Sequence, residues 1–262
     1  MTAMLDLSIV VPTCNRAAHL EKLLVSVWTG VGCSYEVIVV DGASDDGTEA
    51  VLLDAKRAMR ESLRIIREER REGFVRAANK GLRAARGRNI TWINDDARPL
   101  AGSLDAAVVQ MDVSSPRVGM LAMFHCCDAT KNVAYQTKRR GRSYKLMHVR
   151  GTLYANFGLA RRETWERLDY FDERFYLYGA DPDFSLKVWH AGLTVEPATN
   201  AYIDHDEHAD ERRATDSERG RRDNETLFEK WDLPPKNVER NDFNPTRPCT
   251  LRGLRPLMNV AA

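Results

Sequence analysis

Three groups of polar residues each follow a short apolar run in the first hundred positions. They are Pro12-Thr13 after Leu7–Val11, Asp41 after Glu36–Val40, and Asn94-Asp95-Asp96 after Asn89–Ile93. Asp and Asn are ordinary turn residues, so any one group alone also fits a solvated turn. Three groups at the ends of apolar runs favour a shared ligand site, because ligands of open α/β sheets bind at the carboxyl ends of the strands.

The third group places two carboxylates, Asp95 and Asp96, side by side. Adjacent negative charges repel each other, and removing them from water is costly, so the pair needs a compensating charge. A divalent cation supplies it, because Mg²⁺ and Mn²⁺ prefer oxygen ligands and are held by one or two carboxylates together with substrate phosphates. The sequence therefore predicts a Mn²⁺ or Mg²⁺ site beside the diphosphate of a nucleotide substrate.

The apolar pattern predicts the elements that position these groups. In addition to the three runs above, we expect a fourth strand at Leu63–Ile66. Helices are expected at Leu20–Trp28, from Thr48 to about Arg60, and at Ala77–Ala85. This alternation predicts an α/β fold with a mostly parallel sheet flanked by helices. Further on we expect helices at Gly102–Met111, Arg162–Leu168 and Asp183–Ala191, strands at Val118–Phe124 and Val195–Ile203, and a basic loop at Lys138–Lys145.

Composition narrows the class of protein. The 262 residues are 43% hydrophobic and carry a formal net charge of +1, which gives no reason to expect a nucleic-acid partner. The five cysteines include no C-x-x-C pair, which is typical of a reducing cytoplasm. Neither a secretory signal nor an apolar run of about 18 residues is present. Neither of the Gly-rich phosphate-binding motifs of dinucleotide oxidoreductases and P-loop NTPases occurs.

Five blocks of this sequence, in order, resemble the glycosyltransferases of family 2, which have the GT-A fold. They are Ile9–Arg16 (similar to VVPTYNR), Val39–Thr48 (similar to VVDDGSTDGT), Glu72–Gly87, Asn94–Asp96 at the metal-binding DXD position, and Phe171–Gly192. The resemblance covers residues 7 to 205. It departs from the family pattern at Gly42, Asn94 and Ala180, where the family usually has an acidic residue.

The resemblance implies roles for individual residues. For the nucleotide-sugar these are Thr13 and Asp41 at the base or ribose, Arg71 at the base or phosphate, and Asp95 at the ribose, with Pro12, Asn15 and Asn79 as further candidates. Asp96 would bind the metal, and His205 would be a further metal or pyrophosphate ligand. Asp181 would be the general base that takes the proton from the acceptor hydroxyl.

The implied function is an inverting glycosyltransferase, a hexosyl- or deoxyhexosyl-transferase. It would move a sugar from a UDP-, GDP- or dTDP-linked donor to a hydroxyl of a glycan, lipid-linked or small-molecule acceptor, in the cytoplasm or peripherally at the inner face of the membrane. A sugar-phosphate nucleotidyltransferase and a non-catalytic nucleotide-sugar-binding scaffold are the alternatives.

The resemblance also implies a single GT-A domain made of two halves and followed by a tail. Residues 1–100 form the expected nucleotide-sugar-binding half, residues 101–231 the irregular acceptor-binding and catalytic half, and residues 232–262 a Pro/Arg-rich tail. The charged stretch Asp206–Arg222 is a candidate for a lid that orders when the donor binds.

Overall fold

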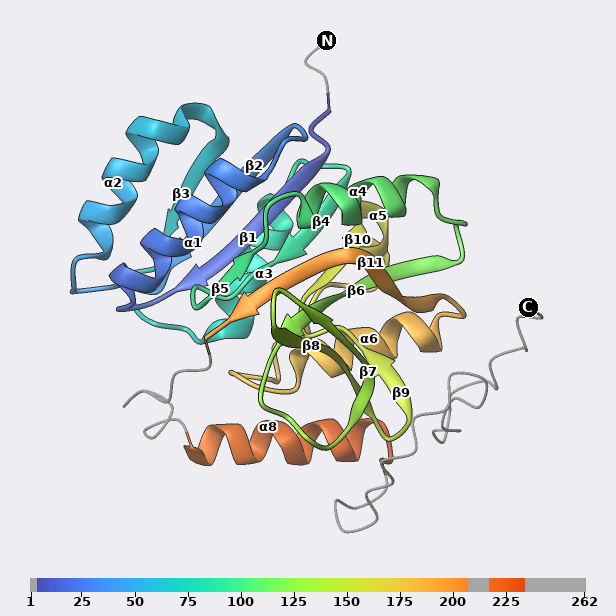
Figure 1. The fold of residues 1–262 in the computed structure, drawn as a ribbon. Helices are drawn as coiled ribbons and strands as arrows, with labels where there is room; N and C mark the ends of the chain where they lie inside the picture. Colours follow the sequence, from blue (N-terminus) through green and yellow to red (C-terminus); the bar gives the residue numbers. More distant parts are fainter. Residues whose placement is uncertain (1–3, 207–216, 234–262) are drawn as a thin grey trace.

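The apolar runs at the start of the chain form four parallel strands. The structure is a computed structural model that describes residues 4–206 and 217–233. Strands β1 (Leu7–Thr13), β2 (Tyr35–Asp41), β3 (Leu63–Arg67) and β4 (Asn89–Trp92) lie in the order β3-β2-β1-β4 (Figure 1). Thr13 is paired with Asp41 in register, and Val10 with Trp92. The predicted parallel arrangement is confirmed for this part of the chain, and the three polar groups follow strand ends on the same side.

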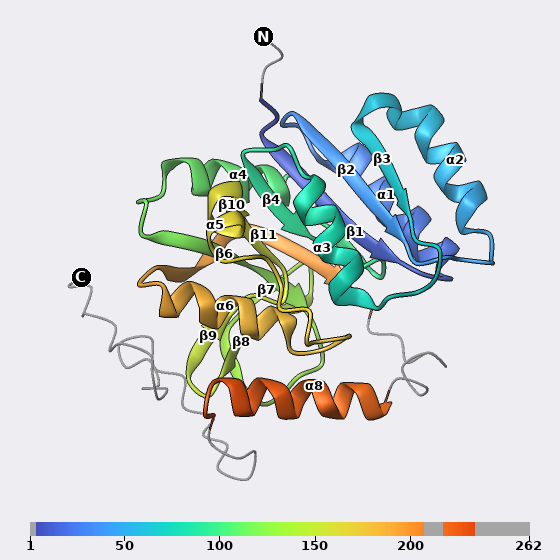
Figure 2. The ribbon, with the colours of Figure 1, turned by 180° about the vertical axis from the view of Figure 1, so that it is seen from behind.

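Helices cover both faces of the sheet. One face carries α1 (Ala17–Gly30), α2 (Thr48–Met59) and α4 (Ser103–Val113), and the other carries α3 (Phe74–Ala84), α5 (Arg162–Arg167) and α6 (Ala180–His190) (Figures 1 and 2). A short 3-10 turn, η1 (Arg60–Ser62), follows α2. In β1, Ile9 and Val11 join the core under α1, whereas Val10 joins the core under α3. Successive side chains of a strand point to opposite faces, so both faces of β1 must be apolar.

Helix α1 shows how the apolar pattern sets burial. Leu20, Leu23, Leu24 and Val27 are buried, as their helical spacing predicts. The same spacing predicts a buried Trp28, but this residue is 53% exposed. The prediction for Trp28 was wrong because the buried stripe of α1 ends at Val27.

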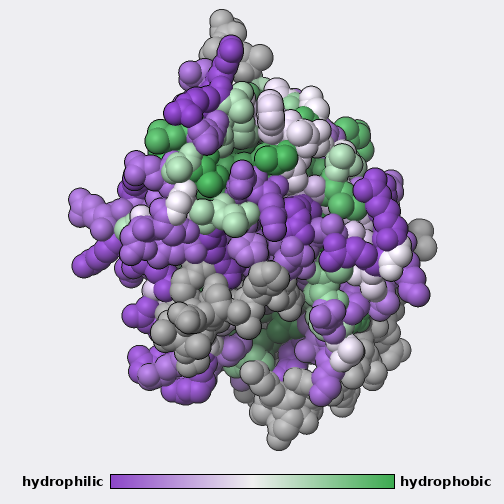
Figure 3. All heavy atoms as spheres, turned by 60° about the vertical axis from the view of Figure 1, so that its left-hand side comes forward, coloured by the Kyte–Doolittle hydropathy of each residue, from purple (hydrophilic) through white to green (hydrophobic). Residues whose placement is uncertain are grey.

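The face of the molecule shown in Figure 3 is mainly hydrophilic, with small apolar areas between polar residues.

The second half of the chain extends the same sheet with mixed pairing. Strand β10 (Gly158–Arg161) joins β4 and β6 (Val118–Cys126), antiparallel to both. Strand β11 (Thr194–His205) runs parallel to β6 and antiparallel to the edge strand β5 (Ala97–Pro99). Both halves of the chain therefore share one sheet, whose parallel pairs are those of its first four strands and the β6–β11 pair.

The basic segment that we expected to be a loop forms a β-hairpin. Strands β7 (Val133–Arg139) and β8 (Arg142–Val149) pair antiparallel, and β9 (Thr152–Tyr154) adds to β8. The turn residues Arg140 and Gly141 both have positive φ, 49° and 77°, the backbone that a two-residue hairpin turn requires. The loop prediction was wrong because four cations at the tip conceal a strand in which Tyr144 to His148 are all buried.

Helix α8 (Ser217–Lys230) lies below the sheet and holds the loop that precedes α6 (Figures 1 and 2). The buried carboxylate of Asp223 accepts hydrogen bonds from the backbone N–H groups of Tyr176, Leu177 and Tyr178, at 2.9, 2.8 and 2.8 Å. Part of the stretch proposed as a lid is thus the first turn of a helix, and residues 207–216 lie outside the described part of the chain. None of the helices in the described residues is long and apolar enough to cross a bilayer.

Replacing Asp223 by Ala is expected to lower the free energy of unfolding by about 2–4 kcal/mol, because three partly buried N–H groups lose a charged acceptor. In thermal unfolding this corresponds to a fall in Tm of roughly 4–16 °C. Glu225→Ala, which removes an exposed carboxylate of the same helix, is the control and should change the free energy by at most about 0.5 kcal/mol. Equal effects of the two substitutions would contradict the role of Asp223.

Candidate active site

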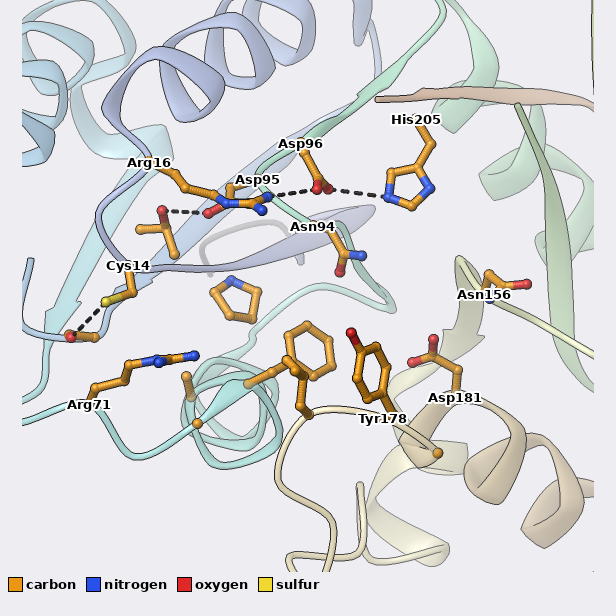
Figure 4. A pocket seen from close by; sticks show the side chains of 18 of the residues that line it. Cys14, Arg16, Arg71, Asn94, Asp95, Asp96, Asn156, Tyr178, Asp181 and His205 are labelled. Carbon is orange, nitrogen blue, oxygen red and sulfur yellow. Dashed lines mark hydrogen bonds and ion pairs between the residues drawn. The ribbon is translucent and has the colours of Figure 1, made fainter. Parts of the chain in front are cut away.

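A cavity of about 570 Å³ opens at the carboxyl ends of β1 and β4. This volume lies within the range of small-molecule sites. Figure 4 shows Arg16, Asp95, Asp96 and His205 along one wall, and Arg71, Tyr178 and Asp181 along the opposite wall. Seven predicted residues line the cavity: Pro12, Thr13, Arg71, Asp95, Asp96, Asp181 and His205. Helix α8 closes part of it through Asn224 and Leu227.

Thr13 and Asp95 connect the ends of β1 and β4. The Thr13 hydroxyl donates a hydrogen bond of 2.9 Å to Asp95 Oδ2, although 82 residues separate the two in sequence. Burial raises the pKa of Asp95 to about 6, against the opposing effect of the nearby Arg16 guanidinium. Asp95 is therefore mostly ionised at neutral pH and remains an acceptor for a ligand hydroxyl.

Arg16 is part of the site, and we assigned it no role from the sequence. Its Nη1 donates to Asp95 Oδ1 at 3.1 Å and to Asp96 Oδ2 at 2.6 Å. The residue directly precedes α1, and it lines the cavity. The available sequence signal was its place at the end of the block Thr13-Cys14-Asn15-Arg16, directly after the first strand.

Asp96 and His205 form the best-placed donor pair for a metal ion. His205 ends β11, and its Nε2 lies 3.2 Å from Asp96 Oδ1. Burial alone would raise the pKa of Asp96, but His205 and then Arg16 favour the carboxylate, and the pKa falls to about 2. A carboxylate oxygen and an imidazole nitrogen this close can contact one cation, and the pair fits Mn²⁺ better than Mg²⁺, which favours oxygen ligands.

The described part of the chain supplies few ligands for such a cation. Within residues 4–206 and 217–233, no three His, Cys, Asp or Glu side chains are grouped to hold a metal ion. A cation at Asp96 and His205 would therefore take its remaining ligands from water and substrate phosphates, as Mg²⁺ does in many nucleotide-binding sites.

Asp181 lies in the first turn of α6, directly after the loop held by Asp223. Gly179 begins the helix with a φ of 80°, a backbone that favours glycine. Burial raises the pKa of Asp181 to about 8. Among the described residues, no hydrogen-bond donor or cation compensates the carboxylate, in contrast to Asp95 and Asp96. A partly buried carboxylate with a raised pKa in a cavity is typical of a proton acceptor in catalysis.

The raised pKa makes stability depend on pH. The folded protein binds the Asp181 proton more tightly than the unfolded chain, whose carboxyl has a pKa near 3.8. The stability contributed by this group is complete below pH 4 and is lost as the pH rises to 8. Asp181→Asn should therefore be more stable than the wild type at pH 8.5, by about 1–2 kcal/mol after allowance for solvent in the cavity, or roughly 2–8 °C in Tm. Thermal unfolding at pH 4.5, 6.5 and 8.5 would contradict this if the difference did not grow with pH.

Three of the predicted nucleotide-sugar ligands lie outside the cavity lining. Asp41 is buried and accepts from the backbone N–H and hydroxyl of Ser44, at 3.1 and 2.5 Å. The Asn15 side chain pairs with Asp45, donating to its carboxylate at 2.7 Å and accepting from its N–H at 2.8 Å. These contacts fix the loops after β1 and β2 against each other.

Asn79 is the third of these residues, and its side chain is fully buried. Its amide donates to Phe171 O at 2.9 Å and accepts from Phe171 N at 3.0 Å. It therefore connects α3 to the segment that leads to Asp181.

In the same region Gly73, with a φ of 97°, lies so close to Tyr176 that a Cβ would be 2.5 Å from the ring. The absence of a side chain at Gly73 thus lets the start of α3 lie against the loop under the cavity.

Sequence reasoning also missed polar residues that the fold brings to the cavity from its second half. Tyr154, Asn156 and Tyr178 line it. The side-chain oxygens of Asn94 and Asn156 are buried and accept no hydrogen bond from the described residues. Buried acceptors without donors are unfavourable, so these two amides are suited to bind the hydroxyl groups of a ligand.

Comparisons with known proteins agree with this geometry. The model of the family "Glycosyl transferase family 2" matches residues 8–185, which include Asp95 and Asp96 of one wall and Asp181 of the other. The chain belongs to this family. It is also similar to the mannosyltransferase PcManGT of Pyrobaculum calidifontis, solved with GDP-Man and Mn²⁺. The TM-score is 0.66 at 22% identity, covering 89% of this chain and 67% of that one. This likeness confirms the GT-A fold that the sequence implied.

Two curated proteins match less than half of this family member. An uncharacterized protein of Mycobacterium tuberculosis is 34% identical over 114 residues, 44% of this chain and 34% of that protein. The GalNAc(5)-diNAcBac-PP-undecaprenol beta-1,3-glucosyltransferase of Campylobacter jejuni is 32% identical over 98 residues, 37% of this chain and 32% of that protein. The chain therefore matches about a third of the length of these relatives.

Proposed function

We propose that this family 2 protein is an inverting glycosyltransferase that uses a nucleoside-diphosphate sugar. The observation that carries the proposal is the arrangement in Figure 4, where the uncompensated carboxylate of Asp181 faces Asp95 and Asp96 across one cavity. A donor held at Asp95 and Asp96 would present its anomeric carbon to the space in front of Asp181. An acceptor hydroxyl between the sugar and Asp181 would then lie opposite the leaving group.

The reaction follows from these positions. In its ionised form, which becomes abundant as the pH approaches its pKa of about 8, Asp181 accepts the proton of the acceptor hydroxyl. The hydroxyl oxygen bonds to the anomeric carbon while the bond from that carbon to the diphosphate oxygen breaks. Attack opposite the leaving group inverts the configuration of the sugar. Positioned acid–base catalysis of this kind contributes about 10²–10⁴ in rate.

The leaving-group side of the cavity fits a divalent cation. Asp96 and His205 would hold Mn²⁺ or Mg²⁺, which when bound offsets the charge that develops on the diphosphate. Thr13 and Asp95 would bind the ribose, and Arg71 would contact the base or a phosphate. Asp41, Asn15 and Asn79 would act by holding the surrounding loops, since their side chains lie outside the cavity.

The acceptor is proposed to enter beside α8 and the β7–β9 strands. The name of the Campylobacter relative refers to a lipid-linked carrier. An acceptor of that kind would require peripheral contact with a membrane. The exposed hairpin tip with Lys138, Arg139, Arg140 and Arg142 carries the positive charge suited to it.

The test is release of nucleoside diphosphate from UDP-, GDP- and dTDP-sugars in the presence of Mn²⁺. Slow, metal-dependent release without acceptor, accelerated by a suitable acceptor, is expected. Pyrophosphate release from a nucleoside triphosphate and a sugar phosphate would instead support a nucleotidyltransferase. Binding of every donor without any turnover would support a non-catalytic scaffold.

A further inference from the structure

The contacts of Arg16 bear on how the cation and the nucleotide bind. The guanidinium bridges Asp95 and Asp96, and all three side chains are largely buried, with exposed fractions of 10%, 10% and 2%. Two carboxylates and one guanidinium leave a local charge of about −1 rather than −2. An arriving divalent cation therefore meets a weaker field than the carboxylate pair alone would provide.

Arg16 also binds one oxygen of the Asp96 carboxylate, the group that a cation would use as a ligand. Its Nη1 is 2.6 Å from Asp96 Oδ2, while His205 lies against Oδ1 of the same group. A metal cation bound at Asp96 and the guanidinium of Arg16 would both be positively charged. In a poorly solvated site the repulsion between them is strong. The structure thus pairs Asp96 with an internal cation.

We propose that Arg16 couples binding of the metal ion to binding of the nucleoside diphosphate. Without nucleotide, Arg16 neutralises Asp95 and Asp96 and opposes the cation. With nucleotide, its guanidinium turns to the diphosphate oxygens and leaves Asp96 to the cation. Arginine is suited to this exchange because its planar guanidinium donates hydrogen bonds to carboxylate and phosphate oxygens alike.

The position of Arg16 permits this movement. The residue lines the cavity, so its guanidinium already borders the space that the donor would fill. Its backbone is held independently, since the carbonyl accepts from the N–H groups of His19 and Leu20, each at 3.0 Å. The side chain can therefore change partners while the start of α1 stays in place. The inference rests on the proposed donor site.

The experiment is calorimetric titration of Mn²⁺ into the protein, with and without saturating UDP, and with GDP or dTDP if the wild type does not bind UDP. In the wild type we expect nucleotide to raise the apparent Mn²⁺ affinity by about 10–100-fold. In Arg16→Gln, Mn²⁺ alone should bind about 3–10-fold more tightly, and the increase caused by nucleotide should shrink by a similar factor. Chelation of Mn²⁺ by free nucleotide is the same for every variant, so the difference between variants reports the protein.

Two further variants complete the design. Arg16→Lys keeps the positive charge and should retain most of the opposition to Mn²⁺ alone. Arg57→Gln, which removes an exposed arginine of α2, should match the wild type in both titrations. Coupling in Arg16→Gln equal to the wild type, with Tm unchanged, would overturn the role of Arg16 and leave the proposed function intact. No binding of Mn²⁺ or nucleotide by the wild type would overturn both.

Discussion

Asp181→Asn is expected to lower kcat for sugar transfer by about 10²–10⁴ while changing the Kd of the nucleoside diphosphate by no more than about twofold. Asn has the shape of Asp but cannot accept the proton of the acceptor hydroxyl. Transfer is measured as product formed per enzyme under saturating donor, and binding is measured by titration with Mn²⁺ present. A loss of this size in kcat with intact binding distinguishes a base from a residue that merely binds donor.

A second variant serves as the control for Asp181→Asn. Asp54→Asn, an exposed carboxylate on α2, controls for loss of one charge and should transfer at the wild-type rate. The gain in stability of Asp181→Asn at high pH, described above, would show that the variant is folded. Transfer by Asp181→Asn at more than about a tenth of the wild-type rate would exclude Asp181 as the base.

Asp96→Ala is expected to abolish the stabilisation of the protein by Mn²⁺ with nucleoside diphosphate and to lower metal-dependent donor cleavage by about 10²–10³-fold. For the wild type, ligand at about 100 times its Kd adds about 2.7 kcal/mol, or roughly 5–10 °C in Tm. The variant should show little of this shift, because it lacks the carboxylate that His205 and Arg16 both contact.

Two comparisons make the Asp96 result specific. His205→Ala should weaken Mn²⁺ binding but keep part of the thermal shift, because Asp96 and the substrate phosphates remain as ligands. The Tm without ligand should identify any general loss of stability in either variant. An Asp96→Ala protein with the full Mn²⁺-dependent shift would place the cation elsewhere.

The local pattern of the sequence was sufficient for most of the elements around the site. Continuous apolar runs and a period of 3.6 residues are properties of neighbouring side chains, so β1 and β2 could be predicted from the first and α1 and α2 from the second. The short strands β5, β9 and β10 could not be predicted in this way. With three or four residues each, they carry too little pattern and are strands only because β11, β8 and β4 lie beside them.

The sequence by itself determined which residues end the central strands, and so brought Thr13, Asp95 and Asp96 into consideration, while Asp181 came from the resemblance to the family. Only the tertiary structure decided which side chains face the cavity. Asp41, Asn15 and Asn79 turn instead to loop and backbone partners, while Arg16 and Asn156 enter the lining. The physical reason is that side-chain direction depends on partners far along the chain, such as Phe171 for Asn79, 92 residues away, and no local pattern encodes such pairs.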